Sequence, residues 1–266
     1  DCINDILNAS KNSKFLIKYC SVDGDLGYSS RFKEHFSQIF DSIQNSEELS
    51  AIETINEIQG FQIGDFLHFL KNARSKLLLR NIVINPTQID NFIQYEYLLN
   101  DINLCHLVKD CSTLAKLRDE LAVSLFSLQT TFSISETQNS TTFIYFLIFS
   151  LWTESILNES YSNDTRRYFL QIVYTFFKRL YLIFDINKFH KDVKEKTKDP
   201  NLYAMVVSYS KLPRILNTLL ATINEILSGN QIGLDRIGSH PIENYIGRIR
   251  CLCHSDNRFE TVCTIY

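Results

Sequence analysis

The chain has 266 residues, of which 45% are hydrophobic and 21% charged, and its formal net charge is −3. This balance is that of a globular protein and excludes a long disordered chain, a collagen-like fibre and a charge-rich tail. Only 8 Gly and 4 Pro are present, too few for the many turns of a sandwich or barrel. We therefore expect a predominantly α-helical fold. Any nucleic-acid binding must rest on local basic patches, because the net charge does not favour it.

The seven cysteines lack the paired spacing of a secreted disulfide scaffold, which predicts reduced thiols and an intracellular chain. The first four residues, DCIN, contain neither an initiator Met nor the start of a signal segment, so we expect a piece of a longer protein. The apolar run over 142–152 is about half the roughly 20 residues of a membrane-spanning helix. The run over 168–186 contains charged residues, which a lipid-facing helix tolerates poorly. Both are predicted to be core helices away from any membrane.

The N-terminal part predicts a strand, an acidic turn and a helix in succession. The strand covers 14–21, where β-branched and aromatic residues are concentrated, and the helix covers 29–40. Asp23 and Asp25 lie in the turn between them. Carboxylates at the end of a strand are well placed to bind a divalent cation, although acids and glycine are also ordinary turn residues.

A second helix is predicted from Asp65, whose side chain is suited to cap it, through residue 81. Between 87 and 227 helical periodicity is nearly continuous. The expected helices cover 87–100, 101–109, 112–128, 140–157, 164–184, 188–197 and 211–227. A final helix begins at His240 and Pro241, with proline at its favoured first position.

Two of these helices contain polar residues that could act in chemistry. Asp65, His68 and Asn72 share one helical face by spacings of three and four, and Glu243 lies near the start of the final helix. Each has an ordinary structural explanation as well. Asp65 is a suitable N-cap, His68 a suitable core histidine, and a glutamate near a helix start interacts favourably with the helix dipole.

Three phrases taken together are more specific. They are SVDGD (21–25), GDFLHFLKN (64–72) and PIENYIGRIR (241–250), and their order and wording resemble the DDE transposases of the P-element and hAT type. The resemblance implies an RNase H-like core interrupted by a large helical insertion. We accordingly expect a partial RNase H-like core over 1–86, an all-helical insertion domain over 87–235 and a returning core helix over 236–266.

The resemblance also implies roles for individual residues. Asp23 would be the second catalytic carboxylate and Glu243 the third, and both would bind metal. Supporting positions in the same phrases would be Asp25, Asp65, His68, Lys71 and Asn72. In those families the first carboxylate lies many tens of residues ahead of the second, whereas only 22 residues precede Asp23 here. We therefore expect the first catalytic Asp to be missing and the segment to be inactive alone.

The implied reaction is cleavage and strand transfer of DNA at transposon ends by two divalent ions, Mg²⁺ or Mn²⁺, about 3.5–4 Å apart. DNA is thus the implied partner and the nucleus the implied location, with a homo-oligomer left open. DNA contacts would have to come from localised Lys and Arg. The candidates are Arg74, Lys76, Arg80, Arg248 and Arg250, with further basic residues at 166–167, 178–179 and 188–198.

Two alternatives remain open on the sequence. The chain could be a domesticated or decayed copy that binds DNA or another protein without catalysis. It could also be an unrelated helical scaffold in which the three phrases coincide by chance.

Overall fold

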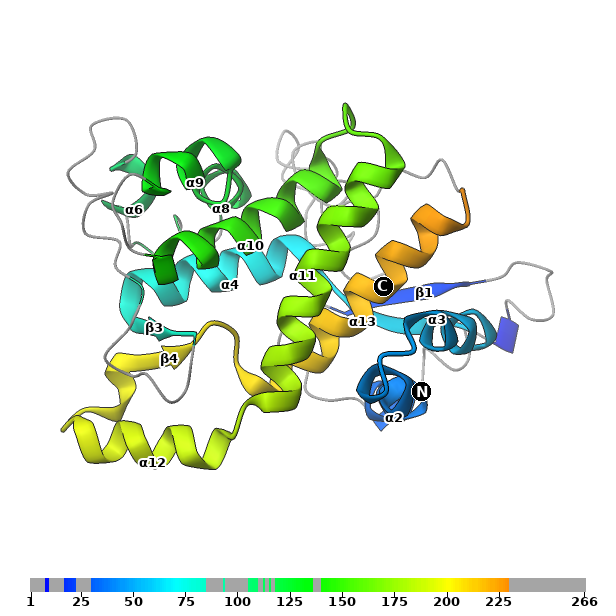
Figure 1. Ribbon diagram of the computed structural model, residues 1–266, viewed down its shortest axis with the longest axis horizontal. Helices are drawn as coiled ribbons and strands as arrows, with labels where there is room; N and C mark the ends of the chain where they lie inside the picture. Colours follow the sequence, from blue (N-terminus) through cyan, green and yellow to red (C-terminus); the bar gives the residue numbers. More distant parts are fainter. Residues whose placement is uncertain are drawn as a thin grey trace, which may run out of the picture.

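The structure is a computed structural model that describes residues 8–9, 17–22, 30–84, 93, 105–109, 112, 115, 118–135 and 140–229 (Figure 1). Over these residues the protein is mostly helical, with two separate pairs of short parallel strands. The predicted predominantly α fold with a small α/β part is confirmed at this level.

The first strand pair comes from the N-terminal part of the chain. β1 (Tyr19–Val22) lies parallel to β2 (Phe61–Gly64). Parallel strands need a crossover connection, and here α2 (Ser30–Gln44) and α3 (Glu48–Glu57) supply it. β1 and α2 lie close to the strand and the helix predicted from the sequence.

The helix α4 (Phe66–Leu79) begins directly after β2. The Asp65 carboxylate accepts hydrogen bonds from the backbone N–H groups of Leu67 (2.8 Å) and His68 (3.4 Å). The predicted N-cap at Asp65 is therefore confirmed. The helix ends two residues earlier than predicted, and β3 (Asn81–Val83) follows.

The later helices are α6 (His106–Lys109), α8 (Asp119–Leu125), α9 (Leu128–Ser135), α10 (Ser140–Leu157), α11 (Asn163–Ile183), α12 (Ile186–Lys196) and α13 (Leu212–Leu227). Of these, α10, α11, α12 and α13 agree closely with the predicted ones. Within the helix predicted over 112–128 the structure describes α8, which begins at Asp119 and ends at Leu125. The helix α9 was not predicted; at its start the Ser127 hydroxyl accepts a hydrogen bond from the Thr130 backbone N–H. The helix predicted over 87–100 lies outside the described residues.

A short strand interrupts the region that we expected to be all-helical. β4 (Tyr203–Met205) follows a 3₁₀ turn, η1 (Pro200–Leu202), and pairs in parallel with β3. A second 3₁₀ turn, η2 (Tyr209–Lys211), leads into α13. The all-helical expectation is thus wrong at 203–205, where a buried apolar run of strand length stands between turn residues. The division into three domains stays a prediction.

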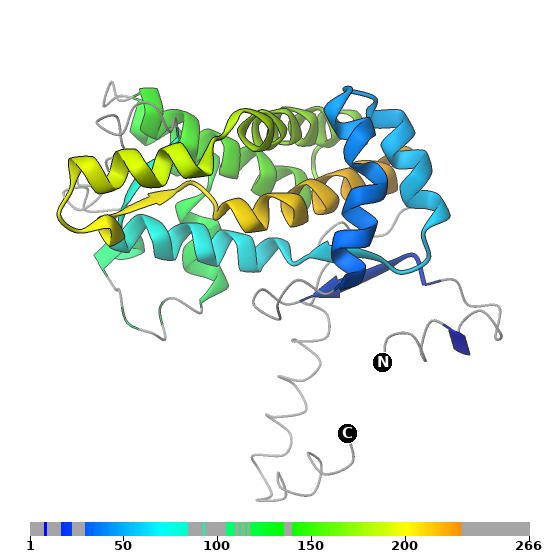
Figure 2. The ribbon, with the colours of Figure 1, turned by 90° about the horizontal axis from the view of Figure 1, so that it is seen from below.

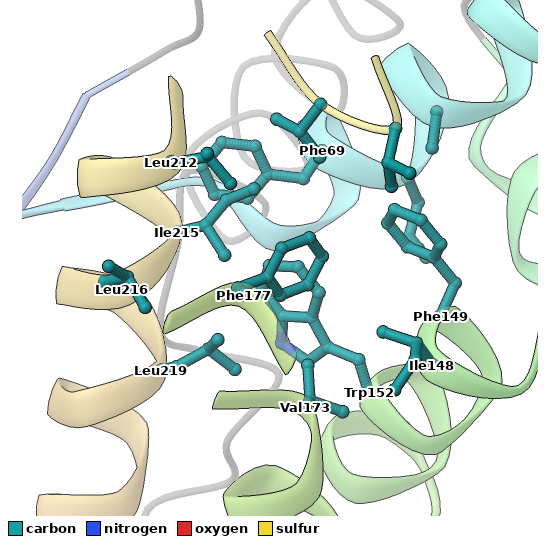
Figure 3. Packing of buried hydrophobic residues seen from close by; sticks show 14 of the residues in the cluster. Phe69, Ile148, Phe149, Trp152, Val173, Phe177, Leu212, Ile215, Leu216 and Leu219 are labelled. Atoms are coloured by element: carbon teal, nitrogen blue, oxygen red, sulfur yellow. The ribbon is translucent and has the colours of Figure 1, made fainter. Parts of the chain in front are cut away.

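The core is centred on Trp152 of α10, which is fully buried. The centroid of its ring lies 5.8 Å from the ring centroid of Phe69 on α4 and 5.8 Å from that of Phe177 on α11. Figure 3 shows these side chains converging, with Leu216 and Leu219 of α13 nearby. By length and composition α10 could cross a membrane. Most of it is buried inside the protein, as predicted for a core helix.

The long helices separate the two strand pairs. β1, α2 and α3 lie at one end of the molecule, while β3, β4 and α12 lie at the other end, as both views show (Figures 1 and 2).

Candidate functional site

The candidate site begins at the carboxyl edge of the β1–β2 pair. Val22, the last residue of β1, is in register with Gly64, the last residue of β2. Asp65 follows Gly64 in the chain, and Asp23 follows Val22. In open α/β sheets, ligands bind at this carboxyl edge. Asp23 and Asp25 themselves lie outside the described residues.

Side chains from two helices bind the outer edge of β2, on the side away from β1. The Gln62 backbone N–H donates to His35 Nδ1 (3.2 Å), and the Gln62 carbonyl accepts from Asn217 Nδ2 (3.1 Å). The Gly64 backbone N–H donates to Thr218 Oγ1 (2.8 Å). His35, Asn217 and Thr218 are all buried. They satisfy backbone groups that a further strand would otherwise bind.

The C-terminal part of α13 lies at the start of β1. Lys18 Nζ lies 2.6 Å from a carboxylate oxygen of Glu225, and Asn224 Nδ2 donates to the Tyr19 hydroxyl (3.0 Å). Burial, followed by the negative charge of Glu225, raises the pKa of Tyr19. Since Thr218 lies at the end of β2, α13 runs opposite in direction to the strands. This helix falls inside the predicted insertion, yet it packs in one unit with β1 and β2.

The D-x-x-H phrase occupies the first two turns of α4. Asp65 is 6% exposed, and its carboxylate caps the helix, while His68 is half-buried. Lys71 Nζ forms an ion pair with Asp119 of α8 at 2.9 Å. Asn72 Nδ2 is buried and has no hydrogen-bond partner within the described part of the chain. The structure thus gives Asp65 and Lys71 local structural contacts, and their supporting role in catalysis stays a prediction.

Arg74 does not occupy the position of a DNA contact. Its side chain is 1% exposed, and Nε and one terminal nitrogen donate to the carbonyls of Leu107 (3.0 Å) and Ala115 (3.1 Å). A buried guanidinium bound to carbonyl groups cannot reach a phosphate backbone. The expectation that Arg74 binds DNA is therefore wrong, and we assign it a structural role instead.

Two other basic residues in the candidate patches are buried as well. Arg166 donates to the carbonyls of Ser155 (2.7 Å) and Ile156 (2.9 Å). Lys178 Nζ pairs with Glu48 at 3.0 Å. Both connect neighbouring elements of the core, so the patches at 166–167 and 178–179 retain only their second residues as candidates for DNA contact.

Lys76 and Arg80 lie at the far end of α4, at the end of the molecule that contains β3, β4 and α12 (Figure 1). Lys76 is half-buried, and its Nζ donates to Ser208 Oγ (3.0 Å). Burial, then the nearby charges of Lys211 and Arg80, lowers the pKa of Lys76 from 10.5 to about 8. Arg80 is exposed.

No missed carboxylate cluster appears, since the described residues contain no group of three or more His, Cys, Asp or Glu arranged to bind a metal.

The remaining predicted site residues, Glu243, Arg248 and Arg250, lie outside the described residues.

Comparison with known proteins gives a likeness of fold. No family model matches the chain, and no curated protein matches its sequence. Among solved structures, the chain is similar to one in the Drosophila P element transposase strand transfer complex, with a TM-score of 0.56 and 18% sequence identity. The match covers 93% of this chain and 58% of that chain. The protein therefore has a transposase-like fold and spans little more than half the length of the chain it matches.

Proposed function

We propose that this chain is part of a DDE-type transposase whose RNase H-like core cleaves and joins DNA at transposon ends. The observation that carries the proposal is the register of β1 with β2, which aligns Val22 with Gly64. In this arrangement the chain positions that precede Asp23 and Asp65 are neighbours at one sheet edge. The likeness of fold to a protein described in a strand transfer complex supports the proposal.

In this proposal Asp23 and Glu243 bind the divalent ions, Mg²⁺ or Mn²⁺. When bound there, such ions would supply activation of the attacking oxygen and stabilisation of the leaving oxygen, and no protein nucleophile would be needed. Asp65 and His68 support the site from the first turn of α4. A DNA substrate in chromosomes implies a nuclear location.

The length of chain after α13 is compatible with a shared site. The last turns of α13 lie at the start of β1, through Glu225 and Lys18. From Gly229 to Glu243 there are 243 − 229 = 14 residues, which span at most roughly 46–50 Å when extended. The four-residue strand that they must pass is about 13 Å long. Glu243 can therefore return to the carboxyl edge where Asp23 is expected.

A complete site needs a third carboxylate. The resemblance implies that it lies on a strand far ahead of Asp23, and we propose that the 266 residues do not include it. The match covers 58% of the neighbour's chain, which is consistent with a further segment that supplies this carboxylate.

Mn²⁺ binding to the 266-residue chain, measured by electron paramagnetic resonance, tests the proposal. We expect weak binding that Asp23→Ala and Glu243→Ala each reduce at least tenfold. Asp164→Ala is the matched control, because its side chain is 91% exposed on α11 and its removal should change nothing. Binding that is indifferent to both site variants would contradict the proposal. DNA binding without any Mn²⁺ binding would instead favour the non-catalytic alternative.

A further inference from the structure

A cavity of about 410 Å³ with basic residues in its lining lies at the end of α4 remote from the β1–β2 pair. Four elements surround it: the end of α4, the helix α12, the strand β4 and the turn η2. Its lining includes Lys76 from α4 and Arg80 directly after that helix, His190 from α12, and Ser208 and Tyr209 from the segment between β4 and α13. Cavities of about 300–1,000 Å³ are typical of small-ligand sites.

The charge of the cavity is one-sided. Lys76 lies in the last turn of α4 and Arg80 is the C-cap residue directly after that helix. The charges of Lys211 and Arg80 are close enough to repel the Lys76 ammonium group. Among the described residues that line the cavity there is no aspartate or glutamate. The cations are thus gathered around a concave space, where low-dielectric walls strengthen their attraction for an anion.

Hydroxyl groups accompany these cations. Ser208 Oγ already accepts a hydrogen bond from Lys76 Nζ at 3.0 Å, so its own hydrogen is available to another acceptor. Ser210 and Tyr209 bring two further hydroxyls to the lining. Ammonium and guanidinium groups give strong charge-assisted hydrogen bonds to phosphate oxygens, and hydroxyl groups can donate further ones.

We propose that this cavity binds a phosphate group, with Lys76 at its half-buried wall and Arg80 at its rim. The volume leaves room for the group that carries the phosphate. A bound phosphate would place a negative charge beside the Lys76 ammonium group. This charge would oppose burial and the neighbouring cations, which lower the pKa of Lys76. The inference goes beyond the proposed function, because it depends neither on Asp23 nor on Glu243.

Isothermal titration calorimetry with inorganic phosphate, at constant ionic strength and pH 7, tests the proposal on the 266-residue chain. We expect measurable binding that Lys76→Gln weakens at least tenfold. Arg80→Gln, at an exposed position where folding is not at risk, should weaken it at least threefold. Lys109→Gln is the control, since it removes the same charge from an exposed position on α6 and should leave binding within twofold.

Two sources of phosphate are distinguished by a second measurement, fluorescence anisotropy with a labelled DNA duplex. If the DNA backbone supplies the phosphate, Lys76→Gln weakens duplex binding, and inorganic phosphate displaces the duplex better than chloride at equal ionic strength. If the ligand is a free phosphate, Lys76→Gln leaves duplex binding unchanged, while it weakens the binding of inorganic phosphate measured by calorimetry. Absence of binding in both assays, or binding that both cavity variants leave unchanged, overturns the proposal.

Discussion

Replacing Thr218 with valine should destabilise the protein by removing one hydroxyl from the edge of β2. Thr218 is 1% exposed, and its Oγ1 accepts the hydrogen bond of the Gly64 backbone N–H at 2.8 Å. Valine has nearly the same shape but no acceptor, so this N–H would be left buried and unsatisfied. Such a group costs about 1–3 kcal/mol. A loss of about 2 kcal/mol corresponds to roughly 4–8 °C in melting temperature for a protein near this size.

Thr222→Val is the matched control. Thr222 lies one turn later on α13 and is also fully buried, but its hydroxyl donates only to the Thr218 carbonyl within the same helix. That carbonyl keeps its backbone partner, so the loss should be about 0.5 kcal/mol or less. Urea unfolding followed by circular dichroism measures both variants. Equal losses in the two would refute the view that Thr218 satisfies the edge of β2.

Further variants test three positions, two next to the candidate site and one, Lys76, at the opposite end of α4. Asp65→Ala should cost about 1 kcal/mol, while Asp65→Asn retains the cap and costs little; equal losses in thermal unfolding would contradict the capping role. Gly64→Ala should cost about 1–3 kcal/mol, because the added Cβ would overlap the buried ring of Phe69; unchanged urea unfolding would contradict this. Lys76→Met should raise stability at pH 7. The folded-state pKa of Lys76, about 8 against 10.5, penalises its protonated form by about 3 kcal/mol. The gain should be full below pH 8 and fade as pH rises to 10.5, and urea unfolding at pH 7 and 10 measures it.

Local signals in the sequence predicted the helices well. The spans 140–157, 164–184 and 211–227 match α10, α11 and α13 to within a residue or two, because long apolar periodicity has few alternative solutions. The cap at Asp65 was equally local, since a capping side chain binds its own next residues.

Features that depend on distant partners could not be predicted in the same way. Arg74 looks like a surface cation in the sequence, and its burial depends on carbonyls 33 and 41 residues further on. The short apolar run that contains β4 suits a buried helix segment as well as a strand, and its strand form depends on pairing with β3. The position of Thr218 against Gly64 joins residues 154 apart, which no periodicity reveals. For the candidate site, the sequence revealed the three phrases and their order. That Val22 and Gly64 are neighbours became known only from the register of β1 and β2.

The 266-residue chain alone should not nick DNA. Two ions held by two carboxylates are poorly neutralised and poorly positioned, and phosphodiester cleavage depends on that placement. The assay is Mg²⁺- or Mn²⁺-dependent nicking of a supercoiled plasmid carrying the element's ends, with Asp23→Ala, Glu243→Ala and the exposed control Asp164→Ala in parallel. We expect the unmodified chain to give no more nicked product than the two site variants. Robust nicking that survives in the control and disappears in both site variants would show that a third carboxylate within these residues completes the site. The chain would then be a catalytic core rather than part of one.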